Sequence, residues 1–192
     1  MTKNKSVRIL AECAIMVALA SVLSLIKIPQ LFFPNLGGSI TLFSMLPICV
    51  IAIKYGPKWG FGTAFVYSAM QLLFGITLDG VLGWGLSAAF LVGTIFFDYL
   101  IPFTALGFAG SFRNSGTPGI MTGITLALLI RWASHIFSGV IFFASWSPWE
   151  NPFIYSLAYN SVYMVPELIL TIAGAVLLYR VKALHKIIAP VK

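Results

Sequence analysis

Hydrophobic residues follow one another along most of this chain in long stretches, and short segments rich in glycine, proline and polar residues separate them. A stretch of roughly 20 mostly apolar residues is long enough to cross the hydrocarbon core of a bilayer as a helix. The breaks have turn chemistry, as in Tyr55-Gly56-Pro57. The pattern predicts an all-α polytopic membrane protein, a six-transmembrane-helix bundle. The expected helices cover residues 6–26, 40–53, 60–76, 85–112, 118–144 and 152–181.

The first two expected helices need a further argument. The first resembles a signal peptide in its basic start and in Ala18-Leu19-Ala20, but its apolar run continues through Ile26, which favours a retained transmembrane helix. The second contains Pro47 and is too short to cross a bilayer upright. It is tilted, buried among the other helices or partly re-entrant.

The composition supports a membrane location. Of the 192 residues, 59% are hydrophobic and 9% are charged, and the mean hydropathy is +0.97. A soluble domain carries about 25% charged residues. A chain with so little polar surface needs the lipid bilayer as part of its solvent, which excludes a soluble globular protein. We expect residues 1–192 to form a single integral-membrane domain.

The net charge of +7 is concentrated at the ends of the apolar stretches. With the N-terminus inside, ten of the 12 basic residues fall in the termini and the inner turns, whereas Lys27 falls in an outer loop and Arg131 within a span. This positive-inside distribution predicts that both termini are cytoplasmic, and it argues against a patch that binds nucleic acid. The ten are Lys3, Lys5, Arg8, Lys54, Lys58, Arg113, Arg180, Lys182, Lys186 and Lys192.

Polar side chains inside the expected spans are few, and each needs a reason because an unpartnered polar group in hydrocarbon is costly. At 1.5 Å per residue, His135 and Asn160 lie about 12–13 Å below the outer ends of their helices, and Asp98 lies about 20 Å along the fourth helix. Aromatic residues stand near the outer ends. We therefore expect a polar cluster under an aromatic mouth, which suits a solute collected from outside. The aromatic residues are Phe143, Trp146, Trp149 and Tyr155, with Tyr99 beside Asp98.

Two interpretations of Asp98 remain open. It forms a buried ion pair with Arg131, or it is the counter-ion of a cationic ligand, to which aromatic faces add cation–π attraction. His135 is a packing residue or a ligand contact, and Trp146 is an interfacial belt residue or a ligand contact.

Small residues line one face of the first expected helix, where Ala11, Ala14, Ala18 and Ser21 recur at helical spacing. Because a small face lets another helix approach closely, it either packs inside the bundle or docks a partner protein. Glu12, near the inner end of this helix, is expected to pair with a neighbouring Lys or Arg.

The first outer loop, residues 27–39, carries Phe32, Phe33 and the pair Gly37-Gly38. Its apolar residues either dip into the membrane interface, or the loop is a lid over an outward-facing site, with the glycines as its hinge.

Catalytic motifs are absent from the sequence. HExxH, GxSxG and GxxxxGK[ST] do not occur, which argues against zinc hydrolysis, serine acyl transfer and ATP binding. Cys13 and Cys49 each lie in an apolar run, as is typical of packing residues. We expect no enzyme activity, no cofactor and no metal, so ATP-driven transport would require a separate ATPase.

Several segments, taken together, carry a family resemblance. They are Gly37-Gly38-Ser39-Ile40-Thr41-Leu42, Met45-Leu46-Pro47, Phe97-Asp98-Tyr99-Leu100, Ala105-Leu106-Gly107-Phe108-Ala109-Gly110, Arg131, His135, Ser138-Gly139-Val140 and Tyr155-Ser156-Leu157-Ala158-Tyr159-Asn160. In this order, and over essentially the full length, they resemble the thiamine-binding S components (ThiT/YuaJ type) of energy-coupling-factor (ECF) importers.

The resemblance implies a six-helix bundle in the bacterial cell membrane with an outward-facing pocket for thiamine. It also implies that the partners are an ECF transmembrane coupling protein and two cytosolic ATPase subunits. The face at Ala14 and Ala18 resembles the alanine motif that such S components present to their membrane partner.

The family's ligand-contacting positions are implied to fall on seven residues here. Some members have glutamate where this chain has Asp98, and a tryptophan in the first outer loop, where this chain has Gly38 near the corresponding place. The stacking aromatic falls on Phe143 or Trp146. The implied positions are Asp98, Tyr99, His135, Phe143, Trp146, Tyr155 and Asn160.

Two other functions stay open. One is a self-contained carrier for another cationic heterocyclic vitamin or precursor. The other is a membrane enzyme that uses Asp98 and His135 as acid and base, against which the missing motifs argue.

Overall fold

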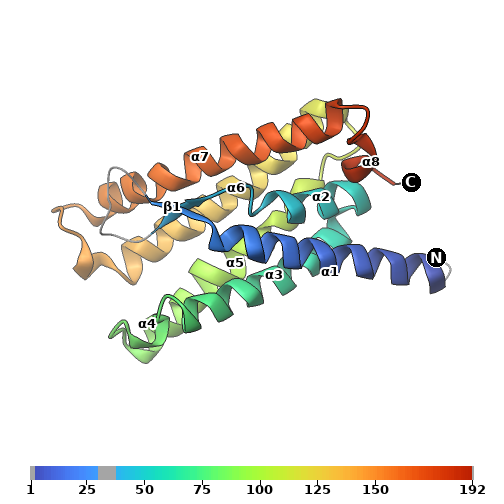
Figure 1. The fold of residues 1–192 in the computed structure, drawn as a ribbon. Coiled ribbons are helices and arrows are strands. Elements are labelled where there is room, and N and C mark those ends of the chain that lie inside the picture. The colour runs from blue at the N-terminus through green and yellow to red at the C-terminus, as the bar shows by residue number, and fades with distance from the viewer. Residues whose placement is uncertain (1–2, 30–37, 192) are drawn as a thin grey trace.

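The structure is a computed structural model that describes residues 3–29 and 38–191. Long helices run roughly side by side, and both chain ends lie at the same end of the bundle, which we call the α8 end (Figure 1). Within the described residues, five helical segments are long and apolar enough to cross a membrane, which confirms the prediction of an all-α multi-span membrane protein. They are α1 (Lys3–Leu25), α3 (Pro57–Thr77), the composite segment Ala88–Gly110, α6 (Gly116–Ile141) and α7 (Pro152–Arg180).

The second expected helix is shorter than predicted. α2 (Leu46–Tyr55) has 10 residues, so its length is about half of the ~30 Å hydrocarbon thickness. Ile48, Cys49 and Ile51 have no exposed surface, so α2 is buried among the other helices. The prediction started it too early because β2 (Ser39–Thr41) pairs antiparallel with β1 (Lys27–Pro29). The expected count of six spans therefore stays a prediction.

The fourth expected helix, predicted as one piece over residues 85–112, changes its winding along its length. Pro102 has no N–H to donate to the carbonyl of Asp98, four residues earlier, and its ring crowds that carbonyl, so a wider turn is favoured there. Asp98 thus lies in a π-helical turn, a rare feature that is frequent at functional sites. The elements in order are η1 (Val81–Gly83), α4 (Ala88–Thr94), the π-helical η2 (Ile95–Leu100), α5 (Ile101–Thr104) and the 3-10 helix η3 (Ala105–Gly110).

Glycines allow the neighbouring helices to approach α2 closely. A Cβ on Gly60 of α3 would lie 2.5 Å from the Cβ of Ala52, and one on Gly110 of η3 would lie 2.2 Å from the carbonyl oxygen of Ala52. Small residues at helix contacts bring backbones together in membrane proteins. The backbones of α3 and η3 therefore pack closely against α2.

The α8 end is closed by the C-terminal segment. Ile188 of α8 (His185–Ile188) is fully buried, and the backbone N–H of Val191 donates to the carbonyl of Lys54 at 2.8 Å. Nearby, Glu12 accepts hydrogen bonds from Lys54 Nζ at 2.7 Å and from the Tyr55 hydroxyl at 2.6 Å. The expected pairing of Glu12 with a basic neighbour is confirmed.

Candidate functional site

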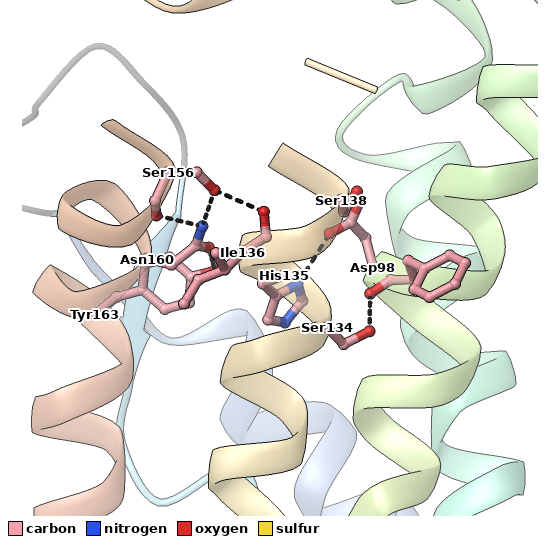
Figure 2. Close-up of polar contacts among 9 residues, drawn as sticks. Asp98, Ser134, His135, Ile136, Ser138, Ser156, Asn160 and Tyr163 are labelled. Carbon is pink, nitrogen blue, oxygen red and sulfur yellow. Dashed lines mark hydrogen bonds and ion pairs between the residues drawn. The ribbon is translucent and has the colours of Figure 1, made fainter. Parts of the chain in front are cut away.

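Asp98 and His135 form the centre of a polar cluster between η2 and α6 (Figure 2). Oδ1 of Asp98 lies 2.9 Å from Nδ1 of His135, and its Oδ2 accepts a hydrogen bond from the Ser138 hydroxyl. His135 and Ser138 are three residues apart on α6, so they share one face of the helix. The side chains of His135 and Asp98 are 9% and 21% exposed. The carboxylate is therefore held in a largely buried position by two side chains of one helix.

Arg131 makes different contacts from those that one interpretation of the sequence predicted. Its guanidinium donates to the sulfur of Met45 at 2.7 Å and lies 4.2 Å from the centroid of the Phe103 ring. Arg131 precedes His135 by one turn of α6, whereas the π-helical turn places Asp98 level with His135. The predicted Asp98–Arg131 ion pair is therefore wrong, and His135 takes that place.

The contact with Asp98 also defines the tautomer of His135. Because a carboxylate only accepts hydrogen bonds, Nδ1 must carry the proton, which leaves Nε2 of a neutral ring as an acceptor. Nε2 is buried and has no hydrogen-bond partner among the described residues. An unsatisfied buried polar atom costs about 1–3 kcal/mol. His135 therefore presents an acceptor that suits an N–H or O–H group of a ligand.

The first half of α7 extends the cluster from the other side of α6. Asn160 Nδ2 donates to the carbonyl of Ser156 at 2.8 Å, and its Oδ1 accepts from the Tyr163 hydroxyl (Figure 2). The Ser156 hydroxyl donates to the carbonyl of Ile136 on α6 at 3.0 Å. These residues recur at helical spacing, so they share the face of α7 that packs on α6. Tyr163 thus links Asn160 to His135, since its hydroxyl donates to Asn160 and its ring lies 6.2 Å from the imidazole.

Aromatic rings form a continuous series from the loop before α7 down to His135. The ring centroids of Trp149 and Tyr155 are 5.5 Å apart, those of Tyr155 and Tyr159 are 6.1 Å apart, and those of Tyr159 and Tyr163 are 5.9 Å apart. The Tyr163 ring lies 6.2 Å from the imidazole of His135. Aromatic pairs favour such separations. The series connects the aromatic end of the bundle to the polar cluster.

Phe143 and Trp146, the two candidates for a stacking residue, lie together after α6. Their centroids are 5.2 Å apart, around the 3-10 turn η4 (Ala144–Trp146). Trp84, from the loop before α4, lies 5.9 Å from Phe143 and 6.3 Å from Trp146. Trp84 therefore belongs with Phe143 and Trp146 in one group of rings, although the sequence did not single it out, and the expected aromatic mouth stays a prediction. We call the end that carries these rings the aromatic end.

Residues 10–187 match the family model described as Thiamine transporter protein (Thia_YuaJ). The chain belongs to this family. The thiamine transporter ThiT of Bacillus subtilis (strain 168) is 33% identical over 183 residues, a match that covers 88% of this chain and 89% of the relative. A solved structure of ThiT from Listeria monocytogenes matches with a TM-score of 0.75 at 21% identity, over 96% of this chain and 99% of that one, which shows that the fold is shared.

Membership of this family defines the class of the molecule. The chain is a multi-pass protein of the bacterial cell membrane, and its relatives are transporters, not enzymes. Among the residues that the structure describes in this transporter-family chain, no group of three or more His, Cys, Asp or Glu side chains could hold a metal ion.

Tyr99 faces away from the other expected ligand residues of this transporter-family chain. A Cβ on Gly75 of α3 would lie 2.3 Å from the Tyr99 hydroxyl oxygen, so the ring occupies the gap that this glycine leaves. Successive residues of a helix point in different directions, and Asp98 faces α6 while Tyr99 faces α3. The structure brings Asp98, His135 and Asn160 together and sets Tyr99 behind them.

Ala14 and Ala18 lie on the outer surface of α1, and both are exposed. Ala11 is exposed with them, whereas Ser21 is buried. The small-residue face therefore does not pack inside the bundle at Ala14 and Ala18, and it is accessible to lipid or to another protein.

The end of the segment between α1 and α2 is held to α7 by a buried carboxylate. Oε1 of Glu167 accepts hydrogen bonds from the backbone N–H of Thr41 at 2.5 Å and from its hydroxyl at 2.6 Å, and Glu167 is 2% exposed. The expected lid, with Phe32, Phe33 and Gly37, lies outside the described residues. The described part of this segment is thus held to the helix that carries Asn160.

Ser138, Ser156 and Tyr163 contact the predicted residues directly but are not among the expected ligand residues. Ser138 follows His135 by three positions, and Tyr163 follows Asn160 by three. A polar side chain within a span that shares a helix face with another needs a partner there. Helical spacing is the signal that could have found both.

Proposed function

We propose that this chain binds thiamine from the outer side of the membrane as the substrate-binding S component of an ECF importer. The observation that carries the proposal is a partly buried carboxylate, Asp98, held by His135 and Ser138 in a member of the thiamine transporter family. Thiamine joins a permanently cationic thiazolium ring to a flat aminopyrimidine. Such a ligand needs one counter-ion, hydrogen-bonding groups and aromatic faces.

The chemistry of the cluster suits each part of thiamine. The Asp98 carboxylate can neutralise the thiazolium, an attraction that is strong where the surroundings exclude water. His135 Nε2 can accept a hydrogen bond from the pyrimidine amino group, which would satisfy its lone pair. The rings of Phe143, Trp146 and Tyr155 can add stacking and cation–π attraction. Asn160 completes the proposed set of direct contacts.

Tyr99 has a different place in this proposal. Its ring fills the gap at Gly75 directly behind Asp98, so we assign it the role of fixing the π-helical turn that presents the carboxylate.

The partners in this proposal are an ECF transmembrane coupling protein and two cytosolic ATPase subunits. The exposed small residues Ala14 and Ala18 support a docking face on α1, and the sequence carries no ATP-binding motif of its own. We expect Ala14→Trp/Ala18→Trp to retain thiamine binding and to lose complex formation and uptake. Ile15→Trp/Leu19→Trp, at the same spacing on exposed neighbouring positions, is the control that should keep uptake. Normal uptake by the first variant would refute the docking face.

Calorimetry of purified protein with thiamine tests the site. Asp98→Asn keeps the shape and the hydrogen-bond acceptor for His135 but removes the charge. Losing a buried charge partner costs about 2–5 kcal/mol, so affinity should fall roughly 30- to several-thousand-fold. Asp79→Asn is the matched control, because Asp79 is 43% exposed and pairs with Lys27. Unchanged thiamine affinity in folded Asp98→Asn would disprove the assignment.

A self-contained carrier for another cationic heterocyclic vitamin or precursor is the competing outcome. Liposomes that contain only this chain should bind thiamine without accumulating it. Accumulation of a cationic heterocycle driven by a proton gradient would favour the carrier.

A further inference from the structure

A cavity lies at the α8 end of the bundle, where both chain ends lie (Figure 1). The cavity has a volume of about 410 Å³ and is lined by Arg113, Asn114, Tyr179, Pro190 and Val191. Cavities that hold small molecules commonly span about 300–1,000 Å³. None of these residues belongs to the proposed thiamine site.

Arg113 is fixed in this cavity by neutral partners. Its Nη1 donates to the carbonyl of Lys54 at 2.8 Å and its Nη2 donates to the carbonyl of Val191 at 3.3 Å. A guanidinium has five N–H groups, and these bonds use two of them. Within the described part of the chain, Arg113 forms no ion pair with a carboxylate. Its positive charge is thus held rigidly and lacks an anionic partner there.

The surroundings of the cavity add to the positive potential. Arg180 donates to the Thr117 hydroxyl at 2.9 Å, and Lys182 and Lys186, which lie in the chain between the lining residues Tyr179 and Pro190, are exposed. Glu12, the acidic residue described near this end, is engaged by Lys54. A cluster of one charge sign around a concave surface concentrates counter-ions. The cavity therefore favours an anion.

The depth of the cavity in the fold indicates the source of that anion. It lies beside Asn114 and Tyr179, where α6 begins at Gly116 and α7 ends at Arg180. The ends of membrane-spanning helices lie at the level of the lipid headgroups, where basic residues attract anionic lipids. We propose that this cavity binds the phosphate headgroup of an anionic phospholipid, with the Arg113 guanidinium as the anchoring cation and Asn114 and Tyr179 as further donors.

Native mass spectrometry can compare retention of phosphatidylglycerol and phosphatidylcholine by the purified protein. Wild-type protein should retain one phosphatidylglycerol in preference to phosphatidylcholine. Arg113→Gln should lower the affinity for phosphatidylglycerol by about fivefold or more, since one basic contact near the surface is worth about 1 kcal/mol. Lys58→Gln removes the same charge from an exposed position outside the cavity, and it should keep the preference. Thiamine binding should be unchanged in both variants, and this result would show that both are correctly folded.

Asn114→Trp provides an independent variant, because Arg113 also supports the chain at Lys54 and Val191. Asn114 is exposed, and an indole there fills the cavity while leaving the Arg113 contacts in place, so the lipid preference should again be lost. Retained preference in Asn114→Trp, or equal loss in Lys58→Gln, overturns the proposal. Displacement of phosphatidylglycerol by an equal concentration of inorganic phosphate would assign the cavity to a soluble anion and would likewise overturn it.

Discussion

Around α2, the space between the helices is filled by side chains such as Ile48 and Ile51, which have no exposed surface. Towards the aromatic end, the space between η2, α6 and α7 holds Asp98, His135 and Asn160 instead. Apolar packing of the first kind stabilises a fold, whereas a buried polar cluster of the second kind costs stability unless each group finds a partner. The region around α2 therefore stabilises the bundle, whereas the polar region lowers its stability wherever a group lacks a partner.

The short length of α2 accounts for the difference. With 10 residues it fills only part of the bundle's length, and the chain before it is the β2 strand and a turn. In that turn Phe43 adopts a left-handed backbone conformation (φ 60°), which non-glycine residues rarely adopt. Beyond α2, β2 packs on α7, and α6 contacts η2 through His135 and Asp98 and α7 through His135 and Tyr163. Because α2 is about half as long as a membrane-spanning helix, it contributes side chains to the packed region and not to the polar one.

The largest expected effect is an all-or-none difference in labelling between the two ends. In a background without Cys13 and Cys49, a cysteine at Asp79 should react with a membrane-impermeant thiol reagent in intact cells, and one at Ser115 should not. Both positions are exposed in the structure, so only the membrane should determine which of the two cysteines the reagent reaches. The opposite pattern would place the aromatic end inside and would remove the basis for binding from outside.

The packed region should be sensitive to added volume. Gly60→Val places a branched side chain against the Cα and Cβ of Ala52, which lie 2.8 Å and 2.5 Å from the position of a Cβ. We expect a loss of about 3 kcal/mol in the free energy of unfolding, as found for overpacked cores. Gly62→Val on the same helix, where nothing lies within 4 Å of a Cβ, should unfold like wild type. Calorimetric melting of both variants checks this, and equal melting temperatures would contradict tight packing at α2.

A smaller effect is expected at the boundary between the two regions, where Glu167 holds Thr41. Thr41→Val removes the hydroxyl bond of 2.6 Å to Glu167, together with the hydroxyl–hydroxyl bond to Ser44, but keeps the backbone bond to Glu167. A hydrogen bond to a charged group contributes about 1.5 kcal/mol or somewhat more, so the melting temperature should fall modestly. Thr77→Val is the control, since its exposed hydroxyl only donates to the carbonyl of Leu73. If both variants melt alike, the Thr41 hydroxyl does not contribute to holding β2 on α7.

The residues of the site could be predicted from the sequence better than their pairing. Asp98, His135 and Asn160 stood out because polar groups in apolar helices need partners. Arg131 and His135 lie one turn apart, so spacing alone could not say which of them meets Asp98. The π-helical turn decided that, and it depends on how Pro102 disturbs the bonding of the turn before it.

Hydropathy and charge by themselves determined that this chain is a helical membrane protein, because a long apolar stretch can satisfy its backbone hydrogen bonds in lipid within itself by forming a helix. Periodicity could not show that α2 is only half as long as a membrane-spanning helix, that Tyr99 faces Gly75, or that Ala14 and Ala18 face outward. Those outcomes depend on contacts between segments far apart in the chain, such as Thr41 with Glu167 and Gly60 with Ala52. Only the tertiary structure decides them, since the same apolar residue suits a helix interior and lipid equally well.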